Sequence, residues 1–125
     1  ISGLDAGNRS LLWVVISHAH ADHCGLADRL PKETVFLMGA ATERILAAAA
    51  EFTPYGCKFE NVIHLEDRKP IELGPFQIVP FLMDHSAYDA YSVLIAAGGR
   101  RLFYTGDLRA HGRKGKLFER LLRRR

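Results

Sequence analysis

The stretch Ser17-His18-Ala19-His20-Ala21-Asp22-His23 decides how this sequence is interpreted, since it places three imidazoles and a carboxylate within seven residues. Ordinary cores and surfaces seldom assemble such a composition, and it is typical of metal ligands. In an extended segment His18 and His20 point the same way, so they can bind one ion together. Asp22 and His23 follow where the chain turns into a helix, and they can bind a second ion beside the first. The stretch therefore predicts two metal ions about 3.5–4 Å apart, an arrangement that holds the attacking and leaving oxygens of a hydrolytic reaction.

The apolar runs around this stretch alternate between strand-like and helix-like patterns, which is typical of α/β layering. We expect strands over 11–16, 35–38, 62–65, 71–73, 76–83, 91–96 and 101–104. We expect helices over 24–30, 41–52 and 116–124. The last helix is amphipathic, with Leu117 and Leu121 on its inward side and Phe118 and Leu122 as further candidates for that side. The sequence thus predicts a sheet flanked by helices.

Two more candidate ligands come directly after predicted strands. His85 follows the strand expected over 76–83, and Asp107 follows the hairpin that ends at 104. Strand ends converge on one edge of a sheet, so we expect both residues to lie beside the histidines of 18–23. Imidazoles and carboxylates suit zinc, and manganese also tolerates the carboxylates. Asp107 has two oxygens and can bridge both ions, while Asp22 can orient a metal-bound water that becomes hydroxide at a pKa of roughly 7.

The pattern His18-x-His20-x-Asp22-His23 resembles the HxHxDH signature of the metallo-β-lactamase superfamily. The segment 84–90, Asp-His-Ser-Ala-Tyr-Asp-Ala, looks like the third-motif histidine of RNase J-like and related β-CASP nucleases, and 104–109 looks like their bridging-aspartate motif. The resemblance implies an α/β sandwich of the metallo-β-lactamase type, with a mixed sheet flanked by helices. It also implies that one metal is held by His18, His20 and His85, the other by Asp22 and His23, and that Asp107 bridges them.

The resemblance covers the first half of that fold, or slightly more. Members of the family usually carry strands before the histidine motif and a second half that supplies a last histidine ligand for the second metal. We therefore expect one partial domain over 1–125. His111 is the only histidine after Asp107, and it can fill that ligand position, contact substrate or do neither. Ser86 can donate a hydrogen bond to a phosphate or cap a turn.

The composition excludes several classes of protein. With 125 residues, 48% of them apolar, the chain can bury one core. No apolar run approaches the ~20 residues that span a bilayer, and the first ten residues lack the pattern of a secretory leader. Cys24 and Cys57 are too few for a disulfide framework. Cys24 is expected to serve helix packing, with a further soft metal ligand as the alternative. We expect a cytoplasmic protein without a membrane segment.

Basic residues are concentrated between Arg100 and Arg125, which suits a polyanion, although a solvated helix end explains them equally well. Tyr88 and Tyr91 can stack on a base or pack within the sheet. We favour metal-dependent hydrolysis of phosphodiesters in RNA or DNA. The same ligands also serve hydrolases of small esters, thioesters or lactones. A third interpretation is a non-catalytic metal-binding half-domain, which would be completed by a missing half or would bury an exposed sheet edge in a homodimer.

Overall fold

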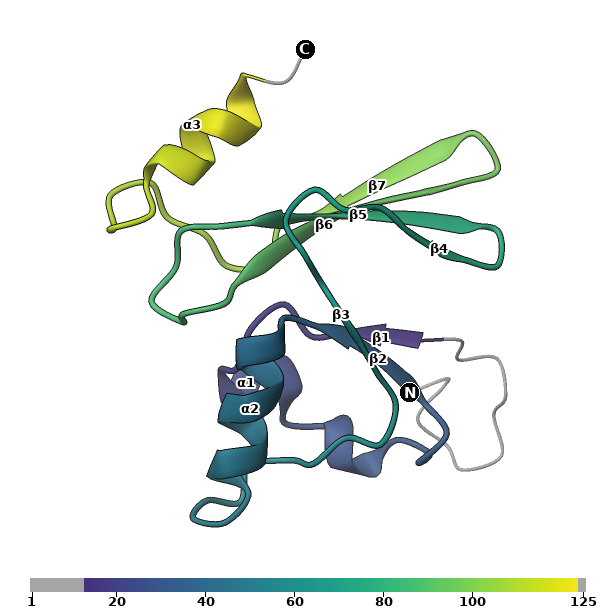
Figure 1. The fold of residues 1–125 in the computed structure, drawn as a ribbon, viewed down its shortest axis with the longest axis vertical. Coiled ribbons are helices and arrows are strands. Elements are labelled where there is room, and N and C mark those ends of the chain that lie inside the picture. The colour runs from purple at the N-terminus through teal and green to yellow at the C-terminus, as the bar shows by residue number, and fades with distance from the viewer. Residues whose placement is uncertain (1–12, 124–125) are drawn as a thin grey trace.

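The computed structural model describes residues 13–123, which form layers of helices and sheets. In Figure 1, helices α1 (Ala21–Cys24) and α2 (Ala40–Ala49) lie below a three-stranded sheet, and a four-stranded sheet lies above it. Helix α3 (Lys116–Leu122) lies on the far side of the second sheet. The expected α/β sandwich with helices outside the sheets is therefore confirmed.

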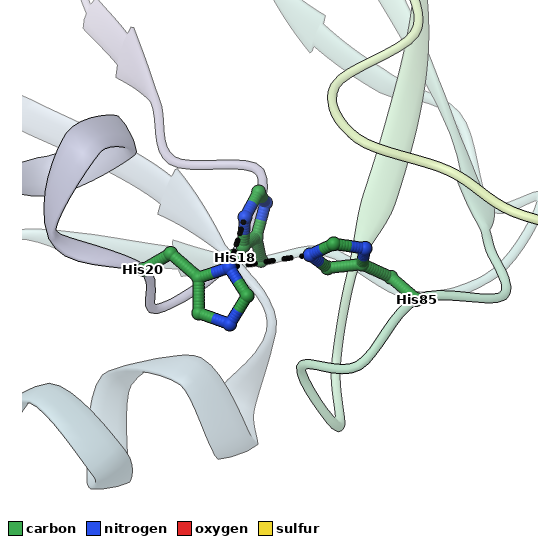
Figure 2. A group of neighbouring side chains, drawn as sticks. All are labelled: His18, His20 and His85. Carbon is green, nitrogen blue, oxygen red and sulfur yellow. Dashed lines mark hydrogen bonds between the residues drawn. The ribbon is translucent and has the colours of Figure 1, made fainter.

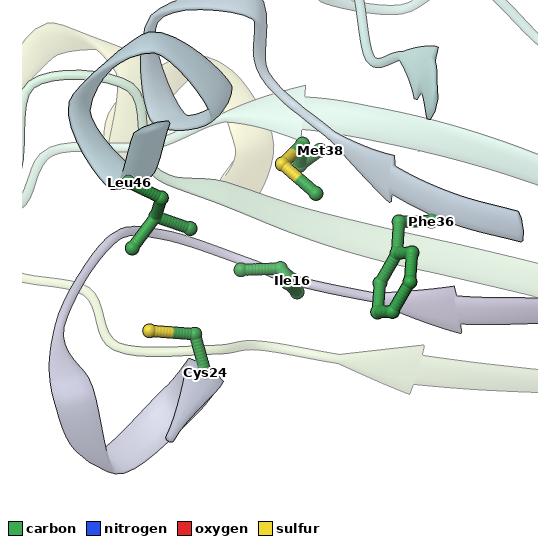
Figure 3. Packing of buried hydrophobic residues seen from close by; sticks show 5 residues of the cluster. All are labelled: Ile16, Cys24, Phe36, Met38 and Leu46. Carbon is green, nitrogen blue, oxygen red and sulfur yellow. The ribbon is translucent and has the colours of Figure 1, made fainter. Parts of the chain in front are cut away.

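The first sheet is parallel, with the strand order β1 (Trp13–Val15), β2 (Val35–Met38) and β3 (Val62–His64). The central strand β2 is buried on both faces. Phe36 and Met38 pack with residues that include Ile16 and Leu46 on the helix side of this sheet (Figure 3). Leu37, which alternates with them, packs in the core between the two sheets.

The second sheet is antiparallel, with the strand order β4 (Ile71–Leu73), β5 (Phe76–Leu82), β6 (Tyr91–Ala97) and β7 (Arg100–Tyr104). Gly98 and Gly99, with φ angles of 54° and 75°, form the tight turn between β6 and β7. Ile78 and Val93 are fully buried and face Leu37 of the first sheet. One core thus joins the two sheets face to face.

The expectation that all candidate ligands meet at one edge of one sheet is wrong. Strands β5 and β7 are both antiparallel to β6, so their carboxyl ends lie at the same edge of the second sheet. The histidine stretch follows β1 of the first sheet. Its side chains lie beside His85 and Asp107, which follow strands of the second sheet. The Tyr91 N–H donates to the Ser17 carbonyl at 2.9 Å and fastens the two sheets together at this point. The chain forms two sheets because each buries one apolar face against the other.

The helix expected over 24–30 is replaced by α1 and a separate 3-10 turn, η1 (Ala27–Arg29). Helix α1 begins directly after His20, whose backbone is extended, and ends before Gly25, a residue of low helix propensity. Asp22 and His23 therefore lie inside a helix. Cys24 is 7% exposed and packs in the core, as expected.

The two longer helices differ from the expectation at their ends. Helix α2 stops at Ala49 rather than at residue 52, ahead of Thr53-Pro54, where the proline disfavours helical backbone in the residue before it. In α3 the side chains of Leu117, Phe118 and Leu121 are half-buried, whereas Leu122 is 67% exposed. Residues 11–12 of the first expected strand and 124–125 at the basic end lie outside the described residues. Among residues 13–123, no helix has the length and apolar character that crossing a membrane requires.

Candidate metal centre

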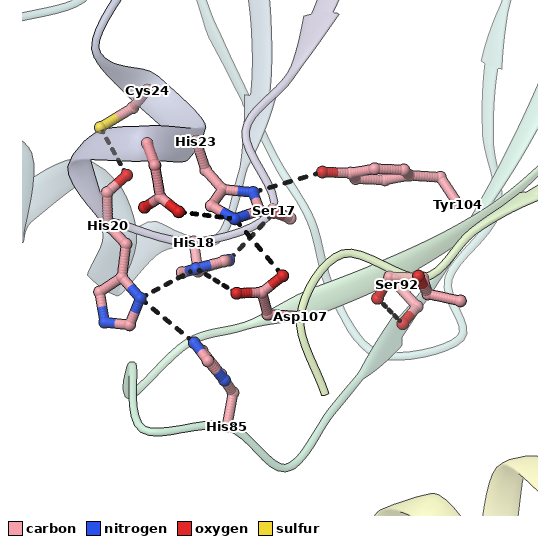
Figure 4. A network of polar contacts seen from close by, with 11 residues as sticks. Ser17, His18, His20, His23, Cys24, His85, Ser92, Tyr104 and Asp107 are labelled. Carbon is pink, nitrogen blue, oxygen red and sulfur yellow. Dashed lines mark hydrogen bonds and ion pairs between the residues drawn. The ribbon is translucent and has the colours of Figure 1, made fainter. Parts of the chain in front are cut away.

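Three separate segments supply the predicted ligands. His18 and His20 lie in the loop after β1, and Asp22 and His23 lie in α1. His85 follows β5, and Asp107 follows β7. Figure 4 shows the side chains from both sheets converging on one place, with His18 at the centre. The structure therefore brings together residues that are far apart in the sequence, such as His18 and Asp107, which are 89 positions apart.

The first group of potential ligands is His18, His20 and His85 (Figure 2). The Nδ1 atom of His20 lies 3.1 Å from His18 Nε2 and 3.2 Å from His85 Nε2. Two nitrogens bound to one tetrahedral zinc, each at about 2.0–2.1 Å, lie roughly 3.4 Å apart. The spacing and the chemistry of these three imidazoles therefore fit a metal ion.

The second group is His18, His23 and Asp107. Asp107 directs one carboxylate oxygen to each histidine: Oδ1 lies 3.4 Å from His23 Nε2, and Oδ2 lies 4.0 Å from His18 Nε2. His18 belongs to both groups, so the two potential sites adjoin. Asp22 Oδ2 lies 3.5 Å from His23 Nε2, on a side chain that is 77% exposed. Asp22 belongs to neither group of described residues, but it lies at the solvent side of the second one.

Burial keeps two of the candidate ligands neutral. His18 is fully buried, and desolvation, followed by the neighbouring His23, lowers its pKa to about 4. Burial, followed by the charge of His20, also lowers the pKa of His85. Metals bind the neutral imidazole, so neither ring needs to release a proton at neutral pH before it can act as a ligand.

A buried carboxylate that the sequence interpretation left without a role ties the two loops of the second sheet together. Asp84 is fully buried, and it accepts N–H bonds from Gly112 at 2.6 Å and from Lys114 at 3.3 Å. Burial alone would raise the pKa of this carboxyl, but these hydrogen bonds and the nearby Arg109 guanidinium hold it below its ordinary value. Asp84 thus joins the residue before His85 to the loop after Asp107. The signal in the sequence was an acidic residue directly after a predicted buried strand.

Asp89 ties the loop that carries His85 to helix α2, which packs against the first sheet. Its Oδ2 accepts hydrogen bonds from the N–H groups of Ala41 at 2.9 Å and Thr42 at 3.3 Å. These are donors of the first turn of α2, which helix geometry leaves without partners. A side chain from the loop between β5 and β6 therefore caps the N-terminus of α2.

Gly106 sets the approach of Asp107 to the histidines. Its φ angle is 54°, and a Cβ atom at this position would lie 3.0 Å from the Ser17 side chain. Glycine adopts this backbone conformation without steric cost and leaves room for Ser17. The positive φ and the close packing together place Asp107 beside His18.

An open cavity of about 520 Å³ adjoins both ligand groups and is lined by His85, Ser86, Gly106, Asp107, Leu108 and Arg109. Ser86 is exposed there, as a substrate contact requires. His111 is exposed and is not brought into either ligand group of the described residues. Tyr88 is 76% exposed, whereas Tyr91 is buried in the core, so only the first of these two rings is open to a ligand.

Comparison with known proteins places this geometry in context. The family model described as Beta-lactamase superfamily domain matches residues 4–122. Ribonuclease J of Helicobacter pylori is 29% identical over 98 residues, which are 77% of this chain and 14% of the ribonuclease. The chain thus corresponds to a small part of that relative.

Solved structures share the fold. A protein of unknown function from Enterococcus faecalis superimposes with a TM-score of 0.78 at 25% identity, over 94% of this chain and 29% of that protein. A metallo-β-lactamase from Cronobacter sakazakii superimposes with a TM-score of 0.65 at 20% identity, over 81% of this chain and 42% of the enzyme. The two-sheet arrangement is therefore a shared architecture.

Proposed function

Since this chain belongs to the β-lactamase superfamily and has a metallo-β-lactamase fold, we propose that it is a metal-dependent hydrolase of phosphodiester bonds in RNA or DNA. The observation that carries the proposal is the pair of adjoining ligand groups that share His18. Ribonuclease J, a relative whose name denotes action on RNA, supports the choice of substrate. The chain spans 14% of that relative, so the relative's activity is carried to this chain only as a proposal.

We assign the candidate ligands to two metal ions, with zinc favoured and manganese as the alternative. His18, His20 and His85 would hold one ion, and Asp22 and His23 the other. Asp107 would bridge the ions, since its two oxygens face different imidazoles. When bound, such ions supply Lewis acidity and a nucleophile at neutral pH.

The residues of the chain itself would position the reactants. The exposed carboxylate of Asp22 can accept a hydrogen bond from an attacking water at the solvent side of the site. The Tyr104 hydroxyl lies 3.5 Å from His23 Nδ1, on the side of the ring away from Asp107 (Figure 4), and can hold the orientation of that imidazole. Asp22 would thus orient the attacking water, and Tyr104 would orient the metal ligand His23.

Nucleic acid is the favoured substrate because exposed cations are concentrated on β7 and in the segment that follows Asp107. Exposed basic side chains between β7 and the end of α3 are Arg100, Arg101, Arg113, Lys116, Arg120 and Arg123. Cations of this kind neutralise phosphates independently of sequence. Tyr88, exposed in the loop after His85, offers a ring on which a base can stack.

The metal assignment is tested by elemental mass spectrometry of the purified chain after loading with zinc and removal of excess metal. We expect two ions per chain in the wild type and a loss of at least one in His20→Ala and in His85→Ala. His64→Ala is the matched control, because His64 is exposed and pairs with Glu43 at 2.6 Å. Unchanged metal content in either ligand variant would refute the assignment. Hydrolysis of bis(4-nitrophenyl) phosphate by the loaded chain then tests the reaction.

A hydrolase of small esters, thioesters or lactones is the second candidate, because the same ligand set serves both reactions. The open cavity beside the site is large enough for a small ligand as well as for a nucleotide. Parallel assays on bis(4-nitrophenyl) phosphate and 4-nitrophenyl acetate separate the two. Metal-dependent hydrolysis of 4-nitrophenyl acetate, without metal-dependent hydrolysis of bis(4-nitrophenyl) phosphate, would favour the small-ester reaction.

A third candidate, a metal-binding half-domain that is active only after association, is supported by the edge strand β7. All five residues of β7 are exposed, and Leu102, Phe103 and Tyr104 are 62%, 40% and 39% exposed. An unpaired edge with apolar side chains favours pairing with another strand. We propose a homodimer or completion by a further segment, and analytical ultracentrifugation with and without zinc tests it. A monomer with two bound ions would refute the need for association.

A cytoplasmic location is also proposed. Both cysteines are free in the structure, with Cys24 buried in the core. Unpaired thiols are typical of proteins in reducing compartments.

A further inference from the structure

The cavity beside the candidate metal centre has two unlike sides. His85 and Asp107, both candidate ligands, form one side. Ser86 and Arg109, which have no place in the proposed metal site, contribute to the rest of the lining. Ser86 directly follows His85, and Arg109 lies two residues after Asp107, so the candidate ligands and these two polar residues line one cavity.

We propose that Arg109 and Ser86 form a subsite for a phosphate oxyanion of the substrate. This inference rests on the proposed hydrolytic function and specifies how its substrate is held. A guanidinium and a hydroxyl are donors that match a phosphate group, and arginine presents two parallel N–H groups to its oxygens.

The side chain of Arg109 is held in place before any ligand arrives. Its Nε lies 3.6 Å from Asp84 Oδ1, and its Nη2 donates to the His85 carbonyl at 3.4 Å. The guanidinium carries five N–H groups, more than these two contacts use. The side chain is 34% exposed, so part of it remains open to the cavity. A cation fixed by a buried counter-ion loses little side-chain entropy when it binds an anion.

The charge of the lining makes the subsite dependent on metal. Asp107 lines the same cavity, and its carboxylate repels an anion placed near Arg109. Metal bound by Asp107 would remove that repulsion. The subsite therefore predicts that inorganic phosphate binds the zinc-loaded chain more tightly than the metal-free chain, and that Arg109 contributes to this binding.

The test is isothermal titration calorimetry of inorganic phosphate into the zinc-loaded full chain, with the zinc content of each variant measured in parallel. We expect Arg109→Gln to weaken phosphate binding at least tenfold, since hydrogen bonds to charged groups contribute strongly. We expect Ser86→Ala to weaken it about threefold. Arg113→Gln is the matched control, because Arg113 is exposed in the same loop but does not line the cavity, and it should change the affinity less than about twofold.

Arg109→Lys separates the subsite from a purely structural role. Lysine keeps a positive charge beside Asp84 but lacks the planar fork, so the variant should keep its zinc and still lose phosphate affinity severalfold. Loss of zinc in Arg109→Lys, with unchanged phosphate affinity per bound zinc, would assign Arg109 to the support of the loop and overturn the subsite.

Two further outcomes keep this inference distinct from the proposed function. Equal weakening by Arg109→Gln and Arg113→Gln would overturn the subsite in favour of general charge, even if the wild type hydrolyses bis(4-nitrophenyl) phosphate. Phosphate binding that depends on zinc and Arg109, in a chain that hydrolyses neither the phosphodiester nor the acetate, would support the subsite and refute the hydrolytic function.

Discussion

The candidate ligands of the first sheet and those of the second sheet are positioned by different kinds of interaction. His18, His20 and His23 lie within six residues, and the turn from β1 into α1 fixes their spacing. His85 and Asp107 lie on separate loops and are 22 positions apart in the sequence. Buried contacts bring them together. The first region is specified locally and the second by tertiary packing. Substitutions outside the ligands should therefore affect the second region more.

The largest effect is expected where both regions depend on one core. Ile78 is fully buried between the sheets, so Ile78→Ala should lower the free energy of unfolding by about 3 kcal/mol through the cavity that it leaves. Chemical denaturation measures this loss. Ile45→Ala is the matched control, because Ile45 is 44% exposed on α2 and should cost less than about 1 kcal/mol. Similar losses in both variants would mean that the two sheets do not share a core.

The second prediction separates the regions. Asp84→Ala leaves the partly buried N–H groups of Gly112 and Lys114 without their acceptor and releases the loops of His85 and Asp107. We expect zinc affinity, measured by competition with a chelator, to fall about 10–100-fold. Asp84→Asn keeps one acceptor oxygen and should fall between this variant and the wild type. Asp28→Ala, at an exposed position, should leave the affinity unchanged. Unchanged affinity in Asp84→Ala would show that the second region does not need its buried carboxylate.

Gly106→Ala should have a smaller effect on stability and zinc affinity. Gly106 lies where the loop of Asp107 packs against Ser17 of the first region. A φ of 54° costs an alanine roughly 1–2 kcal/mol, and the added Cβ also meets Ser17. Gly74→Ala supplies the control, since Gly74 has a φ of 57° with no atom within 4 Å of the added Cβ. Thermal unfolding should show a similar backbone cost in both variants. Only Gly106→Ala should also reduce zinc affinity, and equal zinc affinities would argue against this close packing as a determinant of the site.

The smallest effect is confined to acid solution. The pKa of Asp84 in the folded chain is lowered from its ordinary value, so its ionised form favours folding. That contribution is fully present above the unfolded pKa of about 3.9 and is lost as the pH falls through the folded value. The difference in melting temperature between wild type and Asp84→Asn should therefore be constant near neutral pH and shrink below about pH 4. A difference that shrinks between pH 8 and pH 6 would point to another group.

Secondary structure was predictable from the sequence where a pattern had a clear period or stop. The short apolar run 35–38 and the paired Gly98-Gly99 turn predicted β2 and the β6–β7 hairpin. The segment 24–30 was misassigned, because its apolar residues suggested one helix, whereas the chain enters α1 at Ala21 and breaks at Gly25. Gly25 is a local signal for this break, whereas the packing of Cys24 in one core with Phe36, Met38 and Leu46 depends on the tertiary structure.

The sequence by itself determined the family, the α/β layering and the identity of the candidate ligands, because residue type and short-range spacing carry the chemistry of metal binding. Only the tertiary structure decided that the ligands meet between two sheets, that Asp84 and Asp89 hold the loop of His85, and that Arg109 lines the adjoining cavity. The side-chain hydrogen bonds of Asp84 and Asp89 to the backbone join residues that are 28 to 48 positions apart. They depend on the burial of one sheet face against another, and that burial is a property of the whole packed chain.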